Sequence, residues 1–173
     1  ISDIASKAGI SKKRGKLLAK TTAYFKPKNI LEIGSSLGIS TCYMATGHPE
    51  AKITTLEGCP AIAAIAEENY LKLGFKNINM VVGQFEETLH TVIKDQTFDL
   101  IFFDGNHQKE PTISYFEKCL KASHADSIFI FDDIHWTEEM EGAWNYIRNH
   151  EKVTLSVDTY KWGLVFFHKG RVK

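Results

Sequence analysis

Three acidic side chains follow two apolar runs of the sequence, at a spacing that could bring them to one site. Asp104 ends the run "FDLIFF", and Asp132 and Asp133 end the run "SIFIF". Adjacent parallel strands lie about 4.8 Å apart, so strands that end at these residues would bring the carboxylates together. Like charges so close are costly unless a cation joins them or a pKa rises. Because carboxylate oxygens prefer hard cations, the pattern predicts a site for Mg²⁺ or another divalent metal; the alternative is that Asp133 only caps the next loop.

A histidine stands beside the first of these acids and could move a proton. His107 comes three residues after Asp104, and an imidazole with a pKa of about 6.5 can act as a general base near neutral pH. We therefore predict His107 and Asp104 as catalytic residues; the alternative is a loop histidine that only hydrogen-bonds the carboxylate. His135 and Trp136 follow the second acidic pair and are expected as an outer ligand or substrate contact and as a pocket wall.

A carboxylate with two glycines stands in the segment "LEIGSSLGIS". Glu32 lies in an apolar run, and Gly34 and Gly38 follow it. The spacing E-x-G-x-x-x-G lacks the third glycine of a dinucleotide fingerprint, and a carboxylate here would repel a pyrophosphate. A ligand with cationic groups and no phosphate fits better, and S-adenosylmethionine, with its ammonium, sulfonium and adenosine, is such a ligand. The segment therefore favours S-adenosylmethionine over a nicotinamide cofactor.

Two later segments extend this pattern. Glu57 ends the run "ITTLE", where a carboxylate can accept hydrogen bonds from both ribose hydroxyls of a nucleoside. Gly83 makes a turn after the run "INMVV", and Gln84 and Phe85 could hydrogen-bond and pack against an adenine. Features of this kind at three consecutive strand ends predict a nucleoside-type cofactor.

The elements that must position these residues alternate along the chain. Apolar runs predict strands, and apolar residues spaced three and four apart predict helices. Strands are expected at 29–33, 52–56, 77–82, 98–103, 127–131, 153–160 and 162–168, and helices at about 38–45, 60–73, 85–93, 111–120 and 137–150. This alternation predicts an α/β fold with a doubly wound, mostly parallel seven-stranded sheet. The final two strands have no helix between them, so one strand is expected to be antiparallel.

The first 28 residues are expected to form a basic helical lead segment, followed by one domain at residues 29–173. The segment holds eight Lys or Arg residues and one acid. Two helices are expected, separated by Gly9, with Ser11 as the cap of the second. The apolar face of the second helix is predicted from Leu17, Leu18, Thr21, Tyr24 and Phe25. The spacing in "IASKAGIS" is similar to a helix-turn-helix, which leaves a DNA-binding module as an alternative of another class.

The composition agrees with a folded domain that binds a small molecule. Of the 173 residues, 43% are hydrophobic, and the formal net charge of zero gives no global field toward nucleic acid or a membrane. No apolar run of about 18 residues predicts a transmembrane helix. Cys42, Cys59 and Cys119 lack metal-ligand spacing and are expected to be buried free thiols of a cytoplasmic protein. The chain begins at Ile1 within a helical pattern, so we expect a longer natural N-terminus.

Four segments, "LEIGSSLGIS", "TLEG", "GQFEE" and "FDLIFFDGNH", resemble motifs of the class I S-adenosylmethionine-dependent methyltransferases. The resemblance covers roughly residues 29–173 and implies the Rossmann-like fold of that family. It implies that the first segment holds the methionine part of the cofactor, that Glu57 takes the ribose, and that Gln84 and Phe85 take the adenine. The family usually has an Asp where this chain has Gln84. The predicted cofactor-binding residues are Glu32, Gly34, Ser36, Gly38, Glu57, Gly83, Gln84, Phe85 and Asp104.

The acidic strand ends narrow the resemblance to the divalent-metal-dependent catechol and caffeoyl-CoA O-methyltransferases. In that group an Asp and an Asp-Asn pair bind the metal, and here Asp133 replaces the Asn and His107 replaces a catalytic Lys. The resemblance implies O-methyl transfer to the hydroxyl of a small molecule, assisted by a metal at Asp104, Asp132 and Asp133, in a homodimer. The alternative within the same fold is a metal-independent O- or N-methyltransferase.

Overall fold

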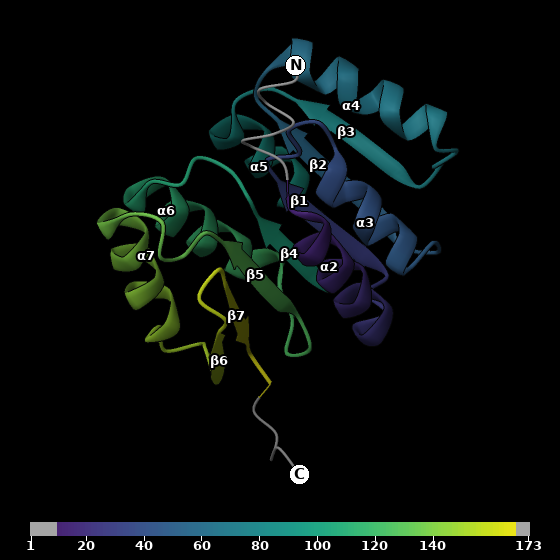
Figure 1. The fold of residues 1–173 in the computed structure, drawn as a ribbon. Helices are drawn as coiled ribbons and strands as arrows, with labels where there is room; N and C mark the ends of the chain where they lie inside the picture. Colours follow the sequence, from purple (N-terminus) through teal and green to yellow (C-terminus); the bar gives the residue numbers. More distant parts are fainter. Residues whose placement is uncertain (1–9, 169–173) are drawn as a thin grey trace.

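Residues 10–168 are described by the computed structural model, and they form a central seven-stranded sheet with helices against both of its faces (Figure 1). The strands are β1 (Asn29–Ile33), β2 (Lys52–Glu57), β3 (Ile78–Val82), β4 (Leu100–Phe103), β5 (Ile128–Asp132), β6 (Leu155–Asp158) and β7 (Trp162–Phe166). The α-helices are α2 (Lys12–Phe25), α3 (Ile39–Gly47), α4 (Pro60–Lys72), α5 (Phe85–Ile93), α6 (Lys109–Cys119) and α7 (Glu138–Arg148). The first helix predicted for the lead segment lies outside the described residues.

The strand order confirms the predicted fold class. It runs β3-β2-β1-β4-β5-β7-β6, and all neighbours are parallel except β7, which is antiparallel to both β5 and β6. The chain leaves β1 toward β3 on one side and then returns to β4 on the other side of β1. In α/β sheets of this kind, ligands bind at the carboxyl ends of the strands beside such a reversal, here between β1 and β4.

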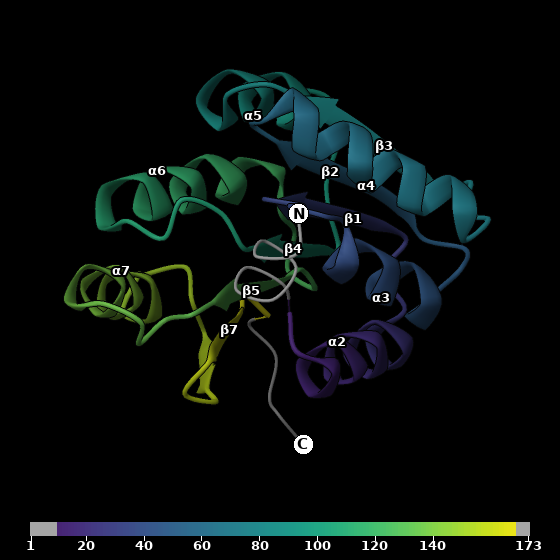
Figure 2. The same cartoon turned by 45° about the horizontal axis from the view of Figure 1, so that its top comes forward.

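The central strands are apolar on both faces because both faces are covered. On one face, Phe103 and Phe131 pack against side chains of α6 and α7 such as Phe116 and Trp144. Phe102 and Ile130 lie on the other face, in a cluster that includes residues of α2 and α3. Figure 2 shows the sheet between these two helical layers. Burial on both faces explains why the runs read as continuously apolar and not as alternating.

Helix α2 shares the core of the sheet, but through a different face from the one predicted. Ser11 caps it as expected, since its side chain accepts a hydrogen bond from the backbone N–H of Arg14. The buried residues are Gly15, Leu18 and Thr22, whereas Tyr24 is 80% exposed. Leu17 and Phe25 are exposed as well. The prediction of a face with Leu17, Tyr24 and Phe25 was wrong because Gly15, which lacks a side chain, marks the line of closest approach to α3.

That approach is close enough to require a glycine. A Cβ on Gly15 would lie 2.1 Å from the ring of Tyr43 in α3, and a Cβ on Gly47 at the end of α3 would lie 2.3 Å from the carbonyl oxygen of Ala19. Leu18 is fully buried in the cluster below. Residue 28 is therefore a boundary between elements and not between separate cores.

Helix α6 begins two residues before Pro111, because a proline is tolerated in the first turn of a helix, where its missing N–H is not needed. Of the cysteines, Cys119 is buried, Cys42 is half-buried and Cys59 is exposed, so the expectation of three buried thiols was wrong for the last two. None of the helices between residues 10 and 168 combines the length and apolar character needed to cross a membrane.

Candidate active site

The predicted site residues follow one another along the carboxyl edge of the sheet. Gln84 and Phe85 come after β3, Glu57 ends β2, and the glycine loop follows β1. Next along the same edge come Asp104 after β4 and Asp132 at the end of β5. The strand order therefore gathers segments that are separated by up to more than half of the chain into one row.

The loop after β1 bends sharply at three positions. Gly34, Ser36 and Gly38 have φ values of 95°, 47° and 78°. A Cβ on Gly34 would lie 2.5 Å from the backbone oxygen of Asp104, and a Cβ on Gly38 would lie 2.4 Å from the ring of Tyr70. The sequence predicted that these glycines make room for a ligand. In the structure they make room for the β4 loop and for the Tyr70 ring.

Glu32 lies beneath this loop and not in front of it. Its carboxylate is fully buried and accepts hydrogen bonds from the hydroxyls of Ser40 and Thr41 at 2.5 Å and of Thr55 at 2.6 Å. Burial raises the pKa of this carboxyl above its ordinary value, although the three hydroxyls oppose the shift. The prediction that Glu32 faces a cationic ligand, or repels a pyrophosphate directly, therefore needs correction. The carboxyl instead ties the start of α3 to β2.

Glu57 lies at the carboxyl edge of the sheet, as the last residue of β2. Its two oxygens accept hydrogen bonds from the backbone N–H groups of Ser36 and Cys59, both at 2.9 Å. It thereby joins the β1 loop to the β2 loop, with 9% of its surface exposed. Gly58 beside it has open space where a Cβ would stand, with no atom within 4 Å among the described residues. The carboxylate is thus fixed at the edge of an open position.

The segment after β3 supplies an aromatic wall. Gly83 has a φ of 147°, which a side chain rarely adopts, and Gln84 is the N-cap of α5. Phe85 is half-buried and packs edge-on against Tyr115, with the ring centroids 6.1 Å apart. A Cβ on Gly105, in the loop after β4, would lie 2.7 Å from the Phe85 ring. Phe85 therefore reaches from β3 toward the central loops, while Gln84 is exposed.

Asp104 and His107 form a pair, with 3.6 Å between Oδ1 of the aspartate and Nε2 of the histidine. Burial raises the pKa of Asp104 to about 8; the neighbouring His107 opposes this shift, and the nearby Asp132 adds to it. Burial lowers the pKa of His107, but the contact with Asp104 and the charges of the three aspartates outweigh burial and raise it. His107 is therefore not the solvated, unperturbed imidazole that the sequence led us to expect.

A guanidinium from the lead segment occupies the end of β5. The Arg14 side-chain nitrogen Nη1 lies 2.7 Å from Oδ1 and 3.1 Å from Oδ2 of Asp132 and 3.6 Å from Asp133. Lys161 lies 3.3 Å from the same Asp133, whose backbone has a φ of 49°. Sequence reasoning missed Arg14. The available signal was that it is the one Arg among the eight basic residues of the first 28.

The predicted metal ligands do not fit a metal as they are arranged here. In the part of the chain that the structure describes, no three His, Cys, Asp or Glu side chains are grouped so that they could hold a metal ion. The carboxylates of Asp132 and Asp133 already face the cations of Arg14 and Lys161. The predicted set of Asp104, Asp132 and Asp133 is therefore corrected to two ion-paired carboxylates and one that pairs with His107.

His135 and Trp136 are neighbours in the sequence after β5, but their side chains contact different groups. His135 bonds Asp158 at 2.9 Å and Glu141 at 3.2 Å and stacks on Tyr160, so it belongs to a surface cluster and not to the acidic strand ends. Trp136 lies edge-on to His107, with ring centroids 5.5 Å apart. The two rings line a cavity of about 670 Å³, together with Asn106, Gln108, Thr137, Glu138 and Glu139.

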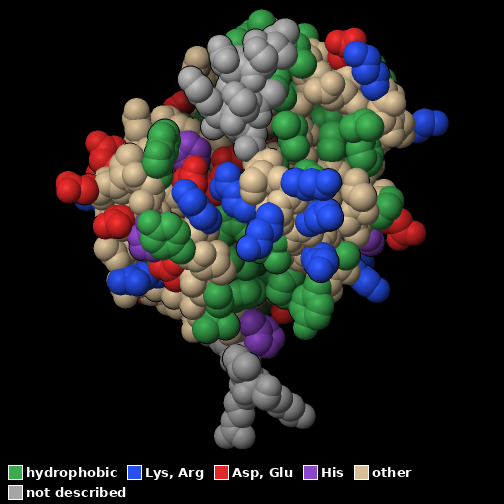
Figure 3. Space-filling model, viewed as in Figure 1, with side chains coloured by type: hydrophobic (Ala, Val, Ile, Leu, Met, Phe, Trp, Pro, Cys, Tyr) green, Lys and Arg blue, Asp and Glu red, His purple; other side chains and the backbone are tan. Residues whose placement is uncertain are grey.

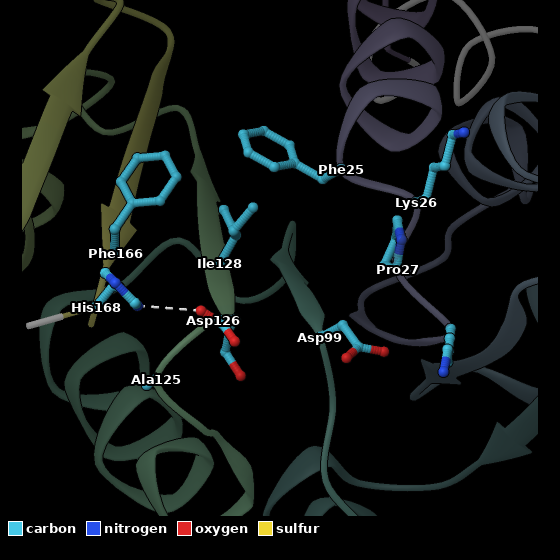
Figure 4. A pocket seen from close by; sticks show the side chains of 11 residues that line it. Phe25, Lys26, Pro27, Asp99, Ala125, Asp126, Ile128, Phe166 and His168 are labelled. Carbon is cyan, nitrogen blue, oxygen red and sulfur yellow. Dashed lines mark hydrogen bonds and ion pairs between the residues drawn. The ribbon is translucent and has the colours of Figure 1, made fainter. Parts of the chain in front are cut away.

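Two other cavities can be compared with this one. A small space of about 10 Å³ lies at the glycine loop, next to Ser36, Ser40 and Asp104. A cavity of about 440 Å³ lies at the opposite, amino end of β4 and β5, where Phe25 and Phe166 approach it from two sides (Figure 4). Its lining includes none of the predicted site residues.

The carboxylates that line the cavity of about 440 Å³ already have hydrogen-bond partners. Asp99 accepts a hydrogen bond from the backbone of Asn29 at 2.7 Å, and Asp126 bonds His168 at 3.1 Å. The predicted catalytic and cofactor-binding residues lie instead at the carboxyl edge of the sheet.

Comparisons with known proteins show which family and which fold this chain shares. A family model described as "Methyltransferase domain" matches residues 31–134. A catechol O-methyltransferase of Mycobacterium tuberculosis is 29% identical over 127 residues, which are 72% of this chain and 56% of that protein. A catechol O-methyltransferase of Niastella koreensis is 30% identical over 129 residues, which are 72% of this chain and 58% of that protein. The chain thus spans little more than half the length of these relatives.

A solved structure extends the likeness to the whole fold. The O-methyltransferase from Bacillus cereus, crystallised in complex with SAH, superposes with a TM-score of 0.81 and 23% identity. The match covers 95% of this chain and 86% of that chain, so helix α2 and the final strand pair lie within the shared fold.

Proposed function

Because the chain belongs to the methyltransferase-domain family, whose model covers residues 31–134, we propose that it is an S-adenosylmethionine-dependent O-methyltransferase. The acceptor would be the hydroxyl of a small molecule, as the names of the two catechol O-methyltransferase relatives suggest. The DNA-binding alternative is not favoured, since the family is one of enzymes. In addition, α2 buries Gly15, Leu18 and Thr22 against the rest of the domain.

The observation that carries the proposal is the row of groups along the carboxyl edge. The aromatic wall of Phe85, the anchored carboxylate of Glu57 and the bent loop around Ser36 come in the order in which an adenine, a ribose and an amino-acid part would need them. These residues fit S-adenosylmethionine, which supplies a methyl group when bound. Glu57 would accept hydrogen bonds from ribose hydroxyls, and Phe85 would pack on the adenine.

The residues next to Asp104 would act on the acceptor. Trp136 and His107 line the cavity of about 670 Å³ and would hold the aromatic ring of an acceptor near the strand ends. Asp104 engages Nε2 of His107, which leaves Nδ1 to take the proton of the acceptor hydroxyl. The main contribution of the protein would be alignment of the acceptor oxygen with the methyl donor. Glu32 would support this from below by fixing the loop.

Calorimetric titration with S-adenosylhomocysteine, next to NAD⁺ as a control, tests the cofactor. We expect micromolar binding of the former and none of the latter. Binding of NAD⁺, or of neither compound, would contradict the proposal. Transfer of a labelled methyl group from S-adenosylmethionine to a simple catechol then tests the acceptor class.

Two further expectations belong to this proposal. A homodimer is expected from the resemblance to related methyltransferases, and light scattering of the purified chain would test it. A cytoplasmic location is expected from the free cysteines, and imaging of the tagged protein in its own cell would test it.

A further inference from the structure

We propose that Arg14 is a built-in cation: its guanidinium occupies the position between the strand-end carboxylates that the sequence assigned to a divalent metal, and it makes this site independent of metal. The inference goes beyond the proposed function. It concerns which cation the carboxylates of Asp132 and Asp133 hold, whatever cofactor lies at the carboxyl edge of the sheet.

The first observation is the burial of the carboxylate. Asp132 is only 4% exposed, and Arg14 is 25% exposed. A buried carboxylate is very unfavourable without a cation or several donors. One nitrogen of Arg14 contacts both oxygens of Asp132, at 2.7 and 3.1 Å, so the guanidinium covers the face of the carboxylate that a metal ion would need.

The second observation is the local charge balance. Asp133 lies 3.6 Å from Arg14 and 3.3 Å from the ammonium of Lys161. Two carboxylates thus face two cations, and the third carboxylate, Asp104, lies 3.6 Å from the ring of His107. A divalent ion added to this arrangement would meet the repulsion of both cations, so it could bind only if Arg14 moved away.

The third observation is that Arg14 is held in place by its own helix. It stands in the first turn of α2, directly before Gly15, whose contact with Tyr43 fixes the distance between α2 and α3. Leu18, one turn later, is fully buried. Figure 3 shows basic side chains gathered over α2, yet Arg14 differs from its exposed lysine neighbours Lys13 and Lys16 because it turns inward to a carboxylate. Displacing the guanidinium would leave Asp132 buried and unpaired.

Manganese binding tests this inference directly. The free Mn²⁺ signal in electron paramagnetic resonance is titrated with the wild-type chain, with Arg14→Gln, and with Arg14→Gln combined with Asp132→Asn. We expect no saturable site in the wild type. Arg14→Gln should gain a site whose Kd is at least about tenfold lower than any wild-type value, and Asp132→Asn should remove it again.

The controls separate charge from structure. Lys161→Gln removes an exposed cation from the same cluster and should bind little Mn²⁺, because Arg14 still covers Asp132. Arg14→Lys keeps a cation and should restore the exclusion of Mn²⁺ relative to Arg14→Gln. Circular dichroism of each variant reports whether it folds. Even if Arg14→Gln does not fold, the titration of the wild type still tests whether Asp132 and Asp133 bind Mn²⁺.

Two results would overturn the inference. One is tight Mn²⁺ binding by the wild type that Asp132→Asn abolishes, since the metal would then displace the guanidinium. The other is a folded Arg14→Gln that gains no site. Neither result touches the binding of S-adenosylhomocysteine, so failure of this inference and failure of the proposed function are distinguishable. Methyl transfer that is unchanged by a chelator is expected if both hold.

Discussion

Arg14 and Asp132 are 118 residues apart in the sequence and 2.7 Å apart in the structure. The pair joins the first turn of α2 to the last residue of β5, so the basic lead segment contributes one of its cations, Arg14, to the candidate active site. An element that packs on one face of the sheet thereby supplies charge to its carboxyl edge. The stability of α2 and the charge state of the site are coupled through this contact.

Removal of the guanidinium should destabilise the fold. Arg14→Ala leaves Asp132, which is 4% exposed, without its cation. Breaking a buried pair costs about 3–5 kcal/mol, and because Arg14 is a quarter exposed we expect about 1–3 kcal/mol. The free energy of unfolding from urea denaturation measures this.

Lys161→Ala is the matched control, because its ammonium is 53% exposed and its pair with Asp133 should contribute less than about 1 kcal/mol. In the double variant Arg14→Ala with Asp132→Ala, the loss should be smaller than the sum of the two single losses. Strictly additive losses would mean that the two side chains do not interact in solution.

The fold could be predicted from the sequence because its determinants are local and repetitive. Strand ends such as Ile33 and helix starts such as Pro60 and Phe85 agree with the expected ranges, since apolar runs and turn residues specify them. The single antiparallel strand, β7, followed from the missing helix before it. The buried face of α2 was missed because Gly15 and Thr22 are not apolar residues yet are buried, and Gly15 packs against Tyr43 of α3.

The places of the site residues along the sheet edge could be predicted from the sequence, but the groups that each side chain contacts could not. Topology alone brings Glu57, Asp104 and Asp132 to one edge. What each carboxylate faces depends on groups that are distant in the sequence. The sequence could not show that hydroxyls from α3 and β2 bury Glu32, or that Arg14 crosses to Asp132, since both are tertiary contacts with no periodic signal.

Buried Glu32 should make stability depend on pH. Its pKa is raised in the folded state by burial, so the folded chain holds the proton more tightly than the unfolded chain. The free energy of unfolding should therefore fall as the pH rises from the ordinary pKa of 4.5 toward the raised value. Glu32→Gln cannot ionise, so its decline over this range should be smaller than in the wild type.

Chemical denaturation at several pH values measures both slopes. Glu50→Gln is the control, because Glu50 is exposed and should leave the slope of the wild type unchanged. The difference between variants isolates Glu32 from Asp104, whose raised pKa contributes in the same direction. Identical slopes for Glu32→Gln and the wild type would contradict the prediction, because they would mean that folding does not change the pKa of Glu32.

Glu57 should decide the affinity for the cofactor product. Glu57→Gln keeps the size of the side chain but loses the negative charge that holds the N–H groups of Ser36 and Cys59 and would accept ribose hydroxyls. Loss of such charge-assisted bonds costs about 1.5–3 kcal/mol, or about tenfold to a hundredfold in Kd. Calorimetry with S-adenosylhomocysteine measures the change. The exposed Glu67→Gln on α4 should bind as the wild type does, and an equal affinity for Glu57→Gln would remove Glu57 from the cofactor site.

His107 should act on the acceptor and not on the cofactor. It is paired with Asp104 and lines the cavity together with Trp136, so His107→Ala removes the proposed general base and leaves the glycine loop and Glu57 intact. Methyl transfer to a catechol should fall about a hundredfold to ten-thousandfold, the usual contribution of a positioned base. The affinity for S-adenosylhomocysteine should not change, which separates a loss of chemistry from a loss of binding. His90→Ala, on the exposed side of α5, is the control that should retain full activity. If His107→Ala transfers methyl groups at the wild-type rate, the histidine is a loop residue that hydrogen-bonds Asp104, and the proton must leave the acceptor by another route.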